Sequence, residues 1–242
     1  MTGESKSQTE DWIEAKGAQY AYAYYSGRTL PDFANVSGIP AAILVDPSGK
    51  VVWQGHPARL NGRIIEEHLE GALPWPLFDF PSEAKKVAKA LEKDDLEDAL
   101  EEARELAAEG ELDVAPRLLE VVEKQIALRV ASIDRAYERG DFLTVVERGE
   151  ELERALGDLP EAERLAALLE KVDDDDFAQD VIALQEQIER IREDVPDMSK
   201  KRQAEDAIED LEKLRDELPD SYAATQAEEL IDKLRKLRVK LR

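Results

Sequence analysis

The chain has 242 residues, of which 43% are hydrophobic and 37% are charged, and its formal charge is −23. This composition predicts a folded protein with buried cores, and the length suits one large domain or two small ones. A chain this acidic repels phosphate backbones and anionic lipid. We therefore expect neither nucleic acid nor a membrane surface as a partner, whereas a basic peptide could bind. Because the chain contains no cysteine, disulfides, thiolate metal sites and cysteine nucleophiles are excluded.

No apolar run approaches the ~20 residues of a membrane span. The first residues, Met1 to Lys6, lack the apolar core of a signal peptide. As written, the sequence therefore predicts a cytoplasmic protein. An extracytoplasmic location, periplasmic or secreted, is expected instead if an export signal has been lost upstream of Met1.

The aromatic residues and the charge divide the chain near residue 80. All three tryptophans precede residue 81, and the sequence beyond it consists mainly of helix-forming residues. Residues 1–80 carry 6 basic and 10 acidic side chains (−4), against 27 and 46 (−19) in the rest. We therefore predict an α+β protein with a partial α/β segment over 1–70, a linker over 71–81 and an α-helical domain over 82–242.

The segment before residue 70 alternates helical and strand patterns. A helix is expected to end at Lys16, a tyrosine-rich strand to cover 18–25, and a short helix to follow over 29–35. The turn sequence Asp46-Pro-Ser-Gly49 predicts a β-hairpin over 41–54. Asn61 is predicted to cap a helix that reaches about Leu69.

This order, together with Val36-Ser-Gly-Ile-Pro40, Ile43-Leu-Val-Asp-Pro-Ser-Gly49, Lys50-Val-Val-Trp53 and Gly55-His-Pro57, resembles the second half of the TlpA-like thiol–disulfide oxidoreductases. These belong to the thioredoxin-like, or redoxin, superfamily. The resemblance implies that Pro40 forms a cis peptide bond facing a redox disulfide. It also implies that the backbone of Ile39 pairs with the bound substrate.

The C-x-x-C half of that domain is not in this sequence, so no catalytic residue is predicted and the chain is expected to be inactive as written. One interpretation is that the recorded start lies too far downstream, which would make this a truncated oxidoreductase. The other is that the gene has lost its redox half and the remnant has rearranged. In both cases a non-catalytic interaction protein that uses the acidic helical domain is the alternative function.

Beyond residue 70, the three prolines of segment 71–81 predict an extended strap whose Trp75, Phe78 and Phe80 pack onto one or both domains. Helical periodicity follows. Ser82 and Asp176 are predicted to be helix caps, and Phe177 is predicted to open an apolar seam. The predicted helices are 82–92, 94–109, 113–139, 142–156, 160–172, 177–194, 199–217 and 221–241. Asp94 or Asp95 is expected to open the second of these, which ends at Glu109 before Gly110.

Ala90–Ala99 and Ala136–Val145 share a pattern at an offset of 46 residues and resemble the helix–turn–helix of degenerate tetratricopeptide repeats. That resemblance implies an array that binds a protein or peptide partner. A helical spacer or a dimerising hairpin explains the same pattern equally well.

The remaining candidate sites have simpler explanations. An EF-hand loop beginning at Asp173 would need Gly and Glu where the chain has Ala178 and Leu184. The two histidines, His56 and His68, do not make a zinc site without further ligands, and His56 is expected to hydrogen-bond locally. We therefore predict no cofactor and no metal.

Overall fold

The computed structural model describes residues 6–16, 41–47, 50–110, 112–195 and 198–239. The chain divides into two compact units, Met1–Glu70 and Gly71–Arg242, and each is described by itself. The described residues are mostly helical with one small antiparallel sheet, which confirms an α+β class in the coarse sense. The predicted strand over 18–25, the short helix over 29–35, and Ile39 and Pro40 lie outside the described residues.

The first unit contains the predicted hairpin. Helix α1 covers Lys6–Lys16, and strands β1 (Ala42–Val45) and β2 (Val51–Gly55) pair antiparallel, with Ala42 opposite Gly55. At the turn, the Asp46 N–H donates to the Lys50 carbonyl (2.9 Å), and the Lys50 N–H donates to Asp46 Oδ1 (3.0 Å). These two bonds close the turn between β1 and β2. The second is typical of a turn aspartate, whose side chain accepts from a backbone N–H a few residues along the chain.

Helix α3 (Gly62–Glu66) is shorter than predicted. The cap is as expected, since Asn61 Oδ1 accepts from the Ile64 N–H at 3.1 Å. Beyond the helix the His68 N–H donates to the Ile65 carbonyl, three residues back, at 2.9 Å. This tighter turn ends the α-helical ladder before Leu69.

The segment 71–81 forms no α-helix, as predicted, and contains one 3₁₀ turn at Leu77–Asp79. Phe80 is buried, and its ring meets Trp75 edge to face with 5.3 Å between ring centroids. Leu73, Trp75 and Leu77 pack against the core of the helical unit. The strap therefore covers one end of that unit's hydrophobic core.

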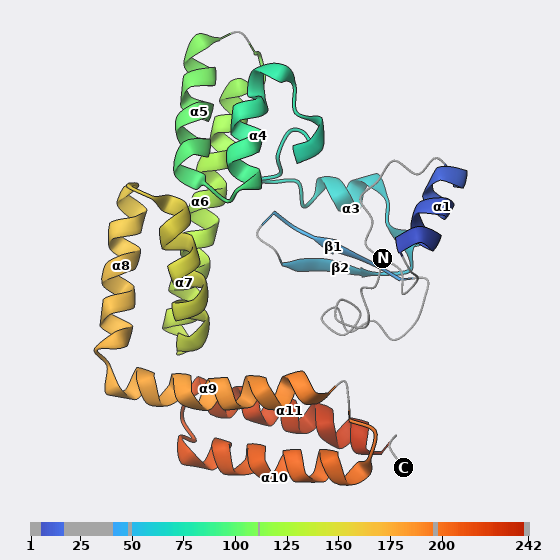
Figure 1. The fold of residues 1–242 in the computed structure, drawn as a ribbon, viewed down its shortest axis with the longest axis vertical. Coiled ribbons are helices and arrows are strands. Elements are labelled where there is room, and N and C mark those ends of the chain that lie inside the picture. The colour runs from blue at the N-terminus through green and yellow to red at the C-terminus, as the bar shows by residue number, and fades with distance from the viewer. Residues whose placement is uncertain (1–5, 17–40, 48–49, 111, 196–197, 240–242) are drawn as a thin grey trace. The chain divides into compact units, whose positions relative to one another are not determined.

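Eight α-helices of 8 to 24 residues account for most of the described part of the second unit (Figure 1). Their bounds lie close to the predicted ones because the signals that begin and end them are local. Asp95 Oδ1, for example, accepts from the Asp98 N–H (3.1 Å), and Gly110 adopts a left-handed φ of 69° where its helix ends. The helices are α4 (Lys85–Glu92), α5 (Leu96–Glu109), α6 (Ala115–Glu138), α7 (Phe142–Leu156), α8 (Pro160–Asp173), α9 (Asp176–Asp194), α10 (Lys201–Glu217) and α11 (Tyr222–Arg238).

The predicted cap at Ser82 is wrong. A 3₁₀ turn over Ser82–Ala84 precedes α4, and the Ser82 hydroxyl donates to the Glu83 carboxylate (2.9 Å) instead of accepting from the backbone. Because residues 82–84 form this 3₁₀ turn, the α-helix begins only at Lys85.

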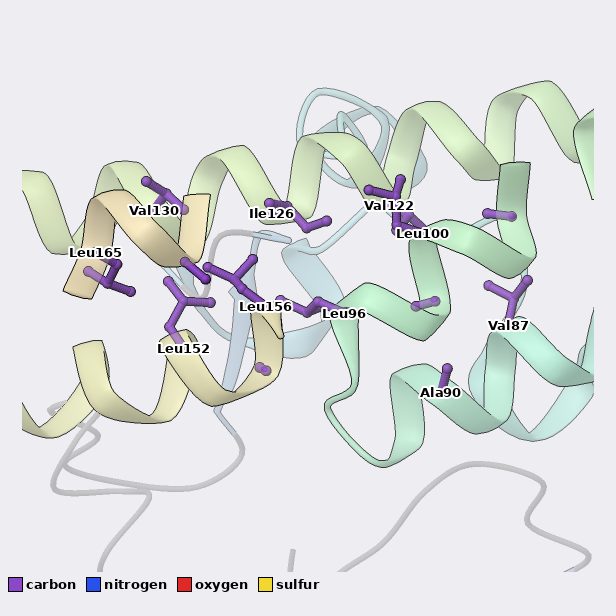
Figure 2. Close-up of a cluster of buried hydrophobic side chains, with 14 of the residues drawn as sticks. Val87, Ala90, Leu96, Leu100, Val122, Ile126, Val130, Leu152, Leu156 and Leu165 are labelled. Atoms are coloured by element: carbon purple, nitrogen blue, oxygen red, sulfur yellow. The ribbon is translucent and has the colours of Figure 1, made fainter. Parts of the chain in front are cut away.

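The helical unit has two hydrophobic cores. The first lies among α4 to α8 and includes Leu96, Val122 and Leu156, which Figure 2 shows converging from three helices. The second lies among α9, α10 and α11 and includes Leu211 and Leu234. Helix α9 contributes to both cores, so it joins the three-helix end of the unit to the rest.

Candidate functional site

A hollow of about 690 Å³ opens on the helical unit where α8 ends and α9 begins. Ala167, Glu170 and Lys171 line it from α8, and Asp174, the C-cap residue just after α8, continues the same face at a spacing of three to four residues. Asp175 and Asp176 complete the lining from the α8–α9 turn. Four carboxylates and one ammonium give the hollow a formal charge of −4 + 1 = −3.

The turn beside the hollow is fixed by Asp175. Its Oδ1 accepts from the Phe177 N–H (3.0 Å) and from the Ala178 N–H (3.3 Å). Gln179 also donates from Nε2 to the Val172 carbonyl (3.0 Å), which ties the start of α9 to the end of α8. The predicted cap at Asp176 is therefore wrong by one residue, because the extended backbone that a cap requires occurs at Asp175 (φ −97°, ψ 104°).

Lys171 is the cation among the lining residues of the hollow, and its ammonium group packs against the Tyr137 ring. Its Nζ lies 4.8 Å from the centroid of the Tyr137 ring, which in turn meets Phe142 edge to face at 5.8 Å. A hydrogen bond with the Tyr137 side chain raises the pKa of Lys171 above its ordinary value. The ammonium therefore stays charged at neutral pH, and its attraction to the ring holds it on the Tyr137 side of the lining.

Phe177 follows the hollow directly in sequence and is 51% exposed. The predicted seam is wrong at this first position and right at Val181, Leu184 and Ile188, which are buried. Ala178 takes the buried position in the first turn of α9 instead. The result is an exposed aromatic ring on the residue that follows Asp176, the last lining residue of the hollow.

A second polar cluster, which the sequence did not predict, is buried where α7, α9 and α11 meet. Gln185 is 1% exposed, accepts from the Leu143 N–H (3.0 Å), and donates to Asp141 Oδ1 and Gln226 Oε1, both at 2.9 Å. The Arg139 guanidinium pairs with Asp141 and lies 5.2 Å from the Tyr222 ring centroid. That pairing raises the pKa of Arg139.

Each polar atom of the Gln185 side chain is bonded within the protein, so this cluster offers nothing to a ligand and is structural. Gly140 contributes by adopting a φ of 78°, which turns the chain between α6 and Asp141.

The residues singled out from sequence do not meet in one place. Ile39 and Pro40 lie outside the described residues. His56 Nδ1 accepts from the Ala58 N–H at 3.2 Å, the local bond that was expected. Across the ranges that the structure describes, no group of three or more His, Asp or Glu side chains is arranged to hold a metal ion.

No protein-family model, curated protein or solved structure matches the chain. Within the described ranges, none of the helices combines the length and apolarity that crossing a bilayer requires. Fold and site together define a mostly helical protein that carries a small antiparallel hairpin and an acidic hollow.

Proposed function

We propose that this chain is a non-catalytic interaction protein whose helical unit binds a basic segment of another protein at the acidic hollow. The observation that carries the proposal is the placement of four carboxylates around an open hollow, with the exposed Phe177 following the last of them in sequence. Carboxylates accept charge-assisted hydrogen bonds from arginine and lysine, and an exposed aromatic ring attracts a guanidinium. Both features favour the same class of ligand.

The size of the hollow sets what it accommodates. The hollow has a volume of about 690 Å³ and is wide open to solvent, so it has room for a few side chains of a short segment without enclosing them. Exposed ion pairs contribute only about 0.2–1 kcal/mol each, and salt screens them. Binding is therefore expected to be weak and to fall steeply as salt is added.

The test is a fluorescence-anisotropy titration with a labelled arginine- and lysine-rich peptide. The double variant Glu170→Lys/Asp174→Lys reverses two charges of the lining and leaves the Asp175 cap intact. We expect it to weaken peptide binding about tenfold or more, since it removes two ion pairs and adds repulsion.

The control is Asp158→Lys/Glu163→Lys, which changes the net charge equally at exposed positions outside the hollow. It is expected to bind nearly as well as the wild type. Equal weakening by both variants would mean that general acidity, and not the hollow, attracts the peptide.

The second candidate function is the redox role that the resemblance to TlpA-like oxidoreductases implies. The paired strands β1 and β2, joined by the Asp46 turn, support it. Since the 242 residues contain no cysteine, the reaction would need a C-x-x-C segment from elsewhere in a longer product. Intact-mass analysis of the native protein tests this: a longer product carrying C-x-x-C supports the redox role, and one that begins at Met1 or Thr2 contradicts it.

A further inference from the structure

The carboxyl-terminal end of this acidic chain is strongly basic. Residues 233–242 contain six lysine or arginine residues and no acidic residue, so the other 232 residues carry 27 − 56 = −29. We call the described part of this stretch, Lys233 to Val239, the basic end. Cations near a helix carboxyl terminus are favourable for the helix itself, but that role does not need six of them.

Part of the basic end is not neutralised within the unit. Arg235 pairs with Glu212 (3.1 Å), and Arg238 pairs with Glu205 (3.8 Å). Lys233 and Lys236 are exposed and form no ion pair with any residue that the structure describes. Val239, 82% exposed, adds an apolar contact at the tip. The basic end is thus an open cationic surface.

Within one molecule, the basic end lies too far from the acidic hollow to contact it. In Figure 1, α9 runs from left to right, α10 returns to the left and α11 runs to the right again. Since α9 also packs against α11, α11 ends at the opposite end of α9 from the hollow. The 19 residues of α9 span about 28 Å at 1.5 Å per residue.

We infer that copies of this chain associate head to tail, with the basic end of α11 in one copy docking onto the acidic hollow of the next. This inference rests on the proposed function, because it names the basic segment that the hollow takes. The unlike surfaces lie at the two ends of one three-helix bundle, so the contact is heterologous and leaves one hollow and one basic end free in a pair. The association is expected to be weak, because each copy carries a net −23.

Charge exchange tests the inference. The hollow-reversed chain is Glu170→Lys/Asp174→Lys. The end-reversed chain is Lys233→Glu/Lys236→Glu/Lys240→Glu/Arg242→Glu, which takes residues 233–242 from a formal charge of +6 to 2 − 4 = −2. In either reversed chain alone, the hollow and the end of α11 carry charges of the same sign and repel each other between copies. In a mixture, the basic hollow of one variant faces the acidic end of the other, and the unchanged surfaces also remain complementary. Lys85→Glu/Lys89→Glu/Lys93→Glu/Arg117→Glu, at exposed positions away from the hollow and the basic end, is the control for the same change of −8 in net charge.

Sedimentation velocity of the full chain over a range of concentrations is the measurement. We expect the wild type and the control to gain mass with concentration at low salt and to lose it at high salt. Each reversed chain alone is expected to stay monomeric, and their mixture to associate. A wild type that is monomeric throughout, or a mixture that fails to associate, overturns the inference.

The basic-peptide titration separates this result from the proposed function. If the peptide binds at the hollow while the wild type stays monomeric, the docking function stands and self-association fails. If neither the peptide nor a second copy binds, both fail.

Discussion

Replacing Leu234 with alanine is expected to lower the free energy of unfolding of the helical unit by about 3–5 kcal/mol. Leu234 is completely buried in the core among α9, α10 and α11, where it is clustered with Leu211 and Ile231. The loss combines the apolar area returned to water with the cavity left behind, since neighbouring helices relax only in part. Urea denaturation followed by circular dichroism measures it.

Val239→Ala is the matched control on the same segment. Val239 is 82% exposed at the end of α11, so its truncation should change stability by less than about 0.5 kcal/mol. Similar effects of the two substitutions would show that α11 does not pack as described.

Replacing Gln185 with leucine is expected to cost about 2–4 kcal/mol. The substitution leaves the Asp141 carboxylate and the Leu143 N–H without their partner in a buried place, and an unsatisfied buried group costs about 1–3 kcal/mol. Because Gln185 links α7, α9 and α11, we also expect the α9–α11 end to unfold before the rest of the unit. Hydrogen exchange measured helix by helix detects this order.

Gln187→Leu is the control, two residues along the same helix. Gln187 is exposed, and its Nε2 donates only to the Ala183 carbonyl of its own helix (3.2 Å). Its replacement should change stability by less than about 0.5 kcal/mol. A small effect at Gln185 as well would contradict the reading of this cluster as the structural link between the two cores.

Local signals in the sequence were enough for most of the helical unit. The bounds 142–156 agree with α7. Helix α5 is capped by Asp95, one of the two residues predicted to open it, and ends before Gly110 as predicted. Caps and left-handed glycines act within a few residues, so the chain itself specifies them. The hairpin around Asp46 is of the same kind, because its turn bonds join residues only four positions apart.

The wrong predictions concern helix starts, where the backbone angles of a single residue determine which of two neighbouring residues caps the helix or is buried. Ser82 and Asp176 have the right chemistry for a cap, but the backbone places a 3₁₀ turn at the first and makes Asp175 the cap in place of the second. Phe177 fits the apolar period of α9, yet Ala178 occupies the buried position. Periodicity fixes a helix face only to within one residue at its first turn.

The sequence by itself determined the helical class of residues 82–242, most of the helix ends, the hairpin and the lack of any thiol. Only the tertiary structure decided how Gln185 meets Asp141 and Gln226, which lie 44 and 41 residues away, and that the acids of α8 and the α8–α9 turn surround a hollow. The physical reason is that capping and turn bonds are short in sequence. The buried network and the hollow depend instead on how whole helices pack, which no local pattern specifies.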